Sequence, residues 1–360
     1  MTDITLIRPR CSEHSKTERL RSILEYSLKG YPYETVSTAE EFQNMKDRKI
    51  LFAISLGESG INLEHYGILK RIRKESHCFD GCIGGIIIDG STELFTKSVG
   101  RELAFSANRS GCTFPGKPLV EGTGSLRNYN VVARNLELDQ LQAYMHSGRE
   151  LVEKIMGFDP PKREKPKILA LHAGDYSRSN TLRLWKLVEQ HLGDCAVTEI
   201  SLKNGTVMDC IGCPYTTCKY FGESGNCIYG GVIVDQVFPA IMDCDALIMI
   251  CPNYNDAVSA NLAAFINRLT ALLKMTTFYD KYLFGLIVSG YSGGDIVAQQ
   301  LISGLNMNKT FILPSGFSML ETANDPGSLL KLEGIEKRAE AFANHIKKHL
   351  GAAAMQRRGL

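Results

Sequence analysis

The chain has 360 residues, of which 44% are hydrophobic and 22% charged, and its formal net charge is +2. This length exceeds what one hydrophobic core usually supports, so two domains are expected. The small net charge excludes the strong positive field typical of proteins that bind nucleic acid, and no such partner is expected. No apolar run reaches ~18 residues, which predicts a cytoplasmic protein with no membrane partner.

The first half alternates strands and helices. Its apolar runs predict strands at Ile4–Ile7, Tyr33–Val36, Ile50–Ser55, Ile83–Ile88 and Pro118–Val120. Helical periodicity predicts helices at Lys16–Lys29, Leu63–Lys74, Leu94–Arg109 and Leu136–Met156. The segment Asp159–Pro166 is rich in proline and charge, so we expect a boundary there between domains of residues 1–160 and 161–360.

The second half shows the same rhythm. Its expected strands are Lys167–Ala173, Val197–Leu202, Asp245–Cys251, Tyr282–Ser289 and Thr310–Leu313. Its expected helices are Thr181–Leu192, Val232–Met242, Ser259–Lys274 and Ser328–Leu350. Five strands with intervening helices predict an α/β fold with a doubly wound parallel sheet.

The two halves also show some similarity to each other. Lys49–Ile72 can be aligned with Lys167–Val188, and Gly85–Gly124 with Ala246–Gly290. Any two βαβ units share this much pattern, so the alignment leaves an internal duplication open. The loop Gly57–Asn62 lacks hydroxyls and arginine in the number that a phosphate needs, and we expect no flavin in the first domain.

A polar loop follows the first strand of the second half and precedes its helix. Such a loop lies where a helix N-terminus faces a ligand, and a phosphate monoester there needs hydroxyl, amide and cationic donors. Five consecutive residues supply this set: Ser177, Arg178, Ser179, Asn180 and Thr181. An ordinary helix cap is the alternative interpretation, because Ser, Asn and Thr are the residues that helix starts prefer.

Two further loops follow the expected strands Asp245–Cys251 and Tyr282–Ser289. The first could border a flat ring with Pro252, Asn253, Tyr254 and Asn255. The second could let backbone amides approach the ring, through Ser289, Gly290, Gly293 and Gly294. A plain strand-to-helix turn is the alternative for each of them.

Together, the segments GDYSRSNT, PNYNDAVSANLAAFINR and SGYSGG resemble the NADPH-dependent FMN reductase family of flavodoxin-like proteins, over about half of the chain. The resemblance implies FMN, with its phosphate on Ser177–Thr181 and its ring between the other two loops. It also implies NADPH or NADH as co-substrate, homo-oligomer formation, and a quinone, flavin, metal or protein acceptor. The flavin carries the chemistry, so no catalytic side chain is expected. Asp175, Ala263 and Asn267 depart from the family pattern.

Four of the eleven cysteines lie close together, as Cys210, Cys213, Cys218 and Cys227 with the spacing C-x2-C-x4-C-x8-C. Four thiolates in so short a loop could hold a [4Fe–4S] cluster or zinc, or could remain free of metal. The segment resembles the cysteine motif of iron–sulfur flavoproteins, with longer spacings. An iron–sulfur electron carrier without direct nicotinamide use and a flavin-free binding module therefore stay open as alternative functions. His65, His77, His146 and His172 lack metal-ligand spacing and are expected to be surface or core residues.

Overall fold

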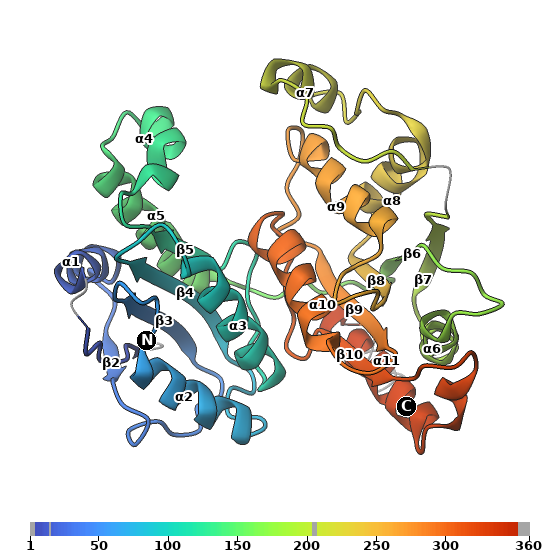
Figure 1. Cartoon of the computed structure of the whole chain (residues 1–360), viewed down its shortest axis with the longest axis horizontal. Helices are drawn as coiled ribbons and strands as arrows, with labels where there is room; N and C mark the ends of the chain where they lie inside the picture. The colour runs from blue at the N-terminus through green and yellow to red at the C-terminus, as the bar shows by residue number, and fades with distance from the viewer. Residues whose placement is uncertain (1–3, 14–15, 204–206, 352–360) are drawn as a thin grey trace. The chain divides into compact units, whose positions relative to one another are not determined.

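The computed structural model describes residues 4–13, 16–203 and 207–351 and divides the chain into two compact units, Met1–Asp159 and Pro160–Leu360. Each unit holds one five-stranded parallel sheet with helices packed on it (Figure 1). The expected fold class, an α/β protein of two doubly wound domains in tandem, is confirmed. No helix in the described part of the chain is long and apolar enough to cross a membrane.

The sheet of the first unit has the strand order β2-β1-β3-β4-β5, which is the flavodoxin-like order. Apart from Lys49, Ser55 and Asp89, its central strands are apolar, because both of their faces are buried under helices. The strands are β1 (Ile4–Ile7), β2 (Tyr33–Val36), β3 (Lys49–Leu56), β4 (Ile83–Gly90) and β5 (Leu119–Gly122).

The helices of the first unit cover both faces of its sheet. The pair α1 and α5 packs on one face around Leu20, Tyr144 and Leu151, and the pair α2 and α3 packs together elsewhere on the sheet. The α-helices are α1 (Thr17–Ser27), α2 (Leu63–Lys74), α3 (Thr96–Arg109), α4 (Asn130–Leu136) and α5 (Gln140–Gly157), and η1 (Arg127–Tyr129) is a 3-10 turn.

The sheet of the second unit has the order β10-β9-β8-β6-β7, so β6 and β8 take the places that β1 and β3 take in the first unit. The carboxyl ends of β6, β8, β9 and β10 therefore lie at one edge. The strands are β6 (Lys167–His172), β7 (Ala196–Ser201), β8 (Ala246–Pro252), β9 (Tyr282–Ser289) and β10 (Ser318–Thr322).

The direction in which the chain crosses the second sheet determines on which face each helix packs. The chain moves outward from β6 to β7 and in the opposite direction from β8 to β10, so right-handed crossovers place the helices on opposite faces. The α-helices are α6 (Asn180–Glu189), α7 (Tyr215–Gly222), α8 (Phe238–Asp243), α9 (Ala260–Leu272), α10 (Gly294–Leu301) and α11 (Ile335–Leu350). Shorter turns are η2 (Ile233–Val237), η3 (Ile302–Met307) and η4 (Ser328–Lys331).

The predicted fifth strand of the second unit, Thr310–Leu313, is wrong. Thr310 has a φ of 74°, and the stretch meets the sheet through isolated bridges such as that of Ile312 opposite Tyr282, without forming a strand. The chain turns after Gly316 and pairs from Ser318 onward, with Thr322 opposite Ser289. The stretch is apolar because it is buried, and burial alone does not distinguish it from a strand.

Three short helices, α4, α7 and α10, have no counterpart in the predicted elements. In addition, the single predicted helix Ser328–Leu350 is divided into η4 and α11 by Gly334, whose φ is 66°. The predicted alignment of the two halves is displaced by one strand, because it pairs β3 with β6 and β4 with β8. The strand orders instead pair β1 with β6 and β4 with β9.

Candidate functional site

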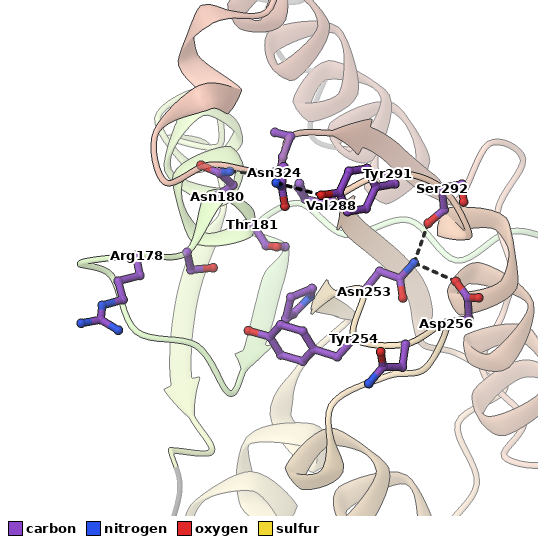
Figure 2. Close-up of a pocket in the computed structure, with 15 residues that line it drawn as sticks. Arg178, Asn180, Thr181, Asn253, Tyr254, Asp256, Val288, Tyr291, Ser292 and Asn324 are labelled. Atoms are coloured by element: carbon purple, nitrogen blue, oxygen red, sulfur yellow. Dashed lines mark hydrogen bonds between the residues drawn. The ribbon is translucent and has the colours of Figure 1, made fainter.

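Four loops at the carboxyl edge of the second sheet line one cavity of about 550 Å³. They follow β6, β8, β9 and β10, and Figure 2 shows their side chains around a common space. The lining residues are Arg178, Ser179, Asn180, Thr181, Pro252, Asn253, Tyr254, Asn255, Asp256, Val288, Gly290, Tyr291, Ser292, Ala323 and Asn324.

The loop after β6 is shaped by its own short polar side chains. Asp175 Oδ1 accepts hydrogen bonds from the amide of Ser177 at 2.8 Å and from its hydroxyl at 2.7 Å. These bonds lower the pKa of Asp175, which also lies 3.8 Å from the Lys203 ammonium. Ser179 then caps α6 by accepting a hydrogen bond from the amide of Leu182 at 3.2 Å. Ser177 does not line the cavity.

Asn180 attaches the start of α6 to the loop after β10. Its side-chain amide donates to the carbonyl oxygens of Ala323 and Asp325, at 3.1 and 2.8 Å. Its carbonyl oxygen accepts from the amide of Gly327 at 2.8 Å. The side chain therefore positions two loops around the cavity and has little capacity left for a ligand.

The N-terminus of α6 offers the donors that an anion needs. The amides of Asn180 and Thr181 belong to the first turn, where an α-helix has no carbonyl to accept from them. Arg178 is exposed, and among the described residues its guanidinium makes no ion pair or hydrogen bond. Arg183 supports this loop by donating to the carbonyls of Arg178 and Ser177, each at 3.2 Å.

The loop after β8 is a tight turn. Tyr254 and Ala257 exchange backbone hydrogen bonds, and the two residues between them, Asn255 and Asp256, have φ values of 52° and 58°. The Asn253 amide nitrogen donates to Asp256 Oδ1 at 3.3 Å and to the carbonyl of Ser292 at 2.8 Å (Figure 2). These bonds connect the loops after β8 and β9.

Close packing at the loop after β9 requires glycine at one position. Gly293 has a φ of 80°, and a Cβ there would lie 1.9 Å from Asp256 Oδ1. The aromatic residues at the cavity are by contrast open to solvent, since Tyr254 is 59% and Tyr291 81% exposed. The Tyr291 hydroxyl lies 3.4 Å from the Asn324 amide, so this ring also meets the loop after β10.

The cavity contains most of the residues that the sequence pointed to. Those outside its lining are Ser177, Ser289, Gly293 and Gly294. Sequence analysis missed Asp256, Val288, Tyr291, Ser292, Ala323 and Asn324. Tyr291 and Ser292 lie inside the glycine-rich segment SGYSGG, of which only the serine and glycines at other positions were predicted to line the site. Ala323 and Asn324 were not predicted, because the fifth strand was expected too early in the chain.

A buried histidine lies directly before the loop after β6. His172 is 3% exposed; its Nδ1 is 3.3 Å from the amide of Gly174 and its Nε2 is 3.3 Å from Glu199 Oε1. Burial lowers the pKa of His172, although the Glu199 carboxylate opposes this effect. Glu199 also accepts from Trp185 Nε1 at 2.8 Å and from Lys186 Nζ at 3.1 Å.

The four clustered cysteines line a second, smaller cavity of about 300 Å³. It lies between α7 and the carboxyl-terminal part of α9, and its other residues include Phe221, Tyr229, Arg268 and Lys274. Arg268 is 2% exposed and donates to the carbonyls of Met208 and Gly230, which closes the base of the cysteine-bearing segment. This cavity shares no residue with the first.

The described residues hold no group of three or more His, Cys, Asp or Glu side chains in an arrangement suited to a metal ion. Cys210, Cys213, Cys218 and Cys227 thus share one cavity without forming such a group. All four are free thiols, and burial raises the pKa of Cys218. A [4Fe–4S] cluster, one of the alternatives that the sequence left open, is therefore not supported.

Charged side chains lie across the corresponding edge of the first sheet. The Arg19 guanidinium binds both carboxylate oxygens of Asp89 at the end of β4, at 2.8 and 2.9 Å, and the Asp89 side chain is fully buried. Arg19 also donates to the carbonyls of Gly90 and Thr123, each at 3.0 Å. Nearby, Glu13 accepts hydrogen bonds from the amide and hydroxyl of Ser59.

In the comparison with known proteins, residues 166–325 match the model of a family described as NADPH-dependent FMN reductase. The matched range contains the strands β6 to β10 and all residues that line the larger cavity. It covers less than half of the chain and lies entirely in the second unit. No curated protein matches.

Several solved structures resemble about half of the chain. An NAD(P)H:quinone oxidoreductase from Methanothermobacter marburgensis is 14% identical, with a TM-score of 0.40 over 51% of this chain and 98% of its own. The Trp repressor binding protein of Bacillus subtilis is 20% identical, with a TM-score of 0.33 over 48% and 94%. An azoreductase from Bacillus anthracis is 15% identical, with a TM-score of 0.35 over 50% and 98%. The fold assignment itself rests on the strand order.

Proposed function

We propose that the second unit, an oxidoreductase domain of the NADPH-dependent FMN reductase type, binds FMN in its 550 Å³ cavity and passes electrons from NADPH or NADH to a small acceptor. The observation that carries this proposal is the convergence of four loops, from four neighbouring strands, on that one cavity. Its size falls within the range of small-molecule sites. FMN, when bound, would accept a hydride and return the electrons, so the protein needs only to hold it.

The residues around the start of α6 fit the phosphate of FMN. The first-turn amides of Asn180 and Thr181 point along a helix dipole that favours an anion. Ser179 uses an oxygen lone pair for its cap and can still donate its hydroxyl proton. Arg178 supplies a cation whose guanidinium makes no hydrogen bond or close ion pair among the described residues. Asp175 opposes this set by its charge, but Lys203 and the bonds from Ser177 offset that charge locally.

The other walls fit a flat, partly polar ring. Tyr254 and Tyr291 expose large aromatic surfaces at the cavity, and a bound ring would remove part of both from water. The tight turn from Tyr254 to Ala257 and the glycine at position 290 bring main chain close to the same space. These loops would hold the ring while its remaining face stays available to a nicotinamide.

The small acceptor that we propose is a quinone, a free flavin or a metal ion, and an acceptor protein is the alternative. An iron–sulfur electron carrier is not proposed, because the cysteine cavity offers no metal-binding group among the described residues. Homo-oligomer formation stays a prediction. A cytoplasmic location also stays a prediction.

The test is an anaerobic titration of the FMN-loaded protein with NADPH and, separately, with NADH. We expect the purified protein to retain FMN through gel filtration and one of the nicotinamides to bleach the flavin absorption. Gly290→Val would place a side chain in the cavity, where even a Cβ meets Asn324 Oδ1 at 3.0 Å, and should abolish FMN retention. Gly193→Val is the matched control, because a Cβ there meets nothing within 4 Å.

Protein that takes up no FMN from excess, or a Gly290→Val variant that retains FMN as well as the control, would contradict the proposed site. Retention of FMN without bleaching by either nicotinamide would leave the site standing and contradict the reductase activity.

A further inference from the structure

His172 occupies a position from which it can control the loop that receives the FMN phosphate. It is the last residue of β6, and the loop of residues 173–179 follows immediately. The ring is 3% exposed and meets the ring of Tyr176, a residue of the same loop, edge to face with centroids 5.8 Å apart. The imidazole therefore packs beneath the loop without lining the cavity.

The two ring nitrogens have different partners, and these partners determine the tautomer. The amide of Gly174 can only donate, so Nδ1, 3.3 Å away, must accept and carries no proton. Nε2 then carries the proton and donates to Glu199 Oε1 at 3.3 Å. The neutral ring thus connects the loop on one side to β7 on the other.

The Glu199 carboxylate is itself held in place by three further donors. They are the Tyr176 hydroxyl, Trp185 Nε1 and Lys186 Nζ, from the loop and from α6. Burial raises the pKa of Glu199, but these hydrogen bonds outweigh burial and the net shift is downward. Glu199, Lys186 and Tyr176 are the titratable groups that face His172, and Glu199 is the one that favours its protonation.

We propose that His172 is a positioning residue for the proposed FMN site, and that protonation of its Nδ1 releases the phosphate loop. The proposal rests on the proposed function for its effect on FMN. A proton on Nδ1 would turn the acceptor for the Gly174 amide into a donor facing a donor, and the hydrogen bond would be lost. Gly174 lies at the start of the loop, so its release would change the placement of the amides and hydroxyls that follow.

Two variants separate the roles of the two nitrogens. His172→Asn keeps an oxygen near the place of Nδ1, so it can accept from Gly174, but it does not titrate and does not reach Glu199. His172→Gln keeps an amide near the place of Nε2 and loses the acceptor for Gly174. His191→Asn, at a partly exposed position next to Gln190 and outside the cavity lining, is the control for loss of a histidine elsewhere.

The first measurement needs no flavin. We expect the ¹⁵N shifts of His172 in FMN-free protein to show an unprotonated Nδ1 at pH 7.5. The Gly174 amide resonance should move as the pH falls and His172 titrates, and it should stay in place in His172→Asn. An Nδ1 that carries the proton at pH 7.5, or a Gly174 resonance indifferent to His172, would overturn the proposal even if the protein binds no FMN.

The second measurement is the FMN dissociation constant between pH 8 and pH 5, from quenching of flavin fluorescence. At high pH we expect His172→Gln to bind FMN on the order of tenfold more weakly than the natural protein, and His172→Asn and His191→Asn to bind within about threefold of it. The FMN phosphate also titrates in this pH range. The pH dependence of the dissociation constant that comes from the phosphate should therefore remain in His172→Asn. A His172→Asn profile identical to the natural one would overturn the proposal.

Discussion

The two units share one topology and differ at the edge of the sheet where ligands bind in folds of this class. In the first unit, Arg19 and Asp89 form a buried ion pair across that edge. In the second, the residues facing the edge are short, polar or aromatic and surround a cavity. The same topology thus carries an ion pair at this edge in the first unit and a candidate binding site in the second.

The two units share a connection between the first helix and the last loop. In both units, a side chain at the start of the first helix donates to the loop after the fifth strand. Lys16 donates to the carbonyl of Gly124, and Asn180 donates to the carbonyls of Ala323 and Asp325. The first helix and the loop after the fifth strand are therefore connected in the same way in both units. The side chains between them determine whether a cavity remains.

The largest expected effect comes from removing one member of the buried ion pair. Arg19→Ala leaves the Asp89 carboxylate buried without its partner, and the free energy of unfolding should fall by about 3–5 kcal/mol. The only tryptophan, Trp185, lies in the second unit, so its fluorescence should report an unchanged transition while circular dichroism shows an earlier one.

The matched control for Arg19→Ala is Arg73→Ala, which removes an exposed pair with Glu102 and should cost less than about 1 kcal/mol. Equal costs for the two variants would show that the Arg19 contact is an ordinary surface pair, and the contrast between the units would lose its main support.

Acid should weaken both units through one histidine in each, the buried His65 and the half-buried His349. Burial lowers the pKa of His65 to about 4 and that of His349 to about 3. Below pH 6.5 the unfolded chain binds a proton at these positions and the folded chain does not. The stabilisation is complete above pH 6.5 and is lost as the pH falls toward the folded values, by about 2 kcal/mol per histidine at pH 5.

Unfolding free energies at pH 7.5 and pH 5 check this prediction in the natural protein and in two variants. His65→Asn should reduce the pH dependence of the first transition alone, and His349→Asn that of the second alone. A pH dependence unchanged in either variant would assign the acid sensitivity to other groups.

A glycine at the candidate site should be more sensitive than a glycine of similar conformation elsewhere. Gly293→Ala combines a φ of 80° with a Cβ 1.9 Å from Asp256 Oδ1, and should cost about 2 kcal/mol and on the order of tenfold in FMN affinity. Gly30→Ala, in the first unit, has a φ of 87° and nothing within 4 Å, so it isolates the backbone strain, about 1 kcal/mol. FMN affinity that falls equally in both would indicate strain and no specific contact.

The smallest expected effect concerns the exposed cation. Arg178→Ala should weaken FMN binding by about tenfold and leave riboflavin binding unchanged, because riboflavin has no phosphate. Arg178→Lys should recover part of the loss. Equal losses for FMN and riboflavin would mean that Arg178 does not contact the phosphate.

The strands were more predictable than the segments between them. Ile4–Ile7 and Tyr282–Ser289 were predicted at their true bounds, since their apolar runs report burial directly. Thr310–Leu313 failed because it is buried for a reason other than pairing with a full strand. The helix α7 was hidden by the cysteine and glycine pattern that drew attention to metal binding.

The site was predictable as far as its residues stand next to each other in the chain. The loops after β6 and β8 carry dense polar motifs, so Ser179 and Asn253 could be found. Asn324 comes from a loop whose place depends on the pairing of β10 with β9, which no local pattern encodes. The side chain of Asn180 was expected on a phosphate, and its hydrogen bonds to Ala323 and Asp325 required knowledge of that same loop.

The segment that opens the second unit is hydrogen-bonded to the end of α11. The amide of Arg163 donates to the carbonyl of Leu350 at 2.8 Å, and Lys162 donates to the carbonyls of Lys348 and His349. The first residues of the unit and the end of its last described helix are therefore neighbours, an arrangement that favours circular permutation and insertion into a host loop. A unit with adjoining ends can change its place in a gene without rebuilding its sheet, which gives tandem copies an easy route to arise and diverge.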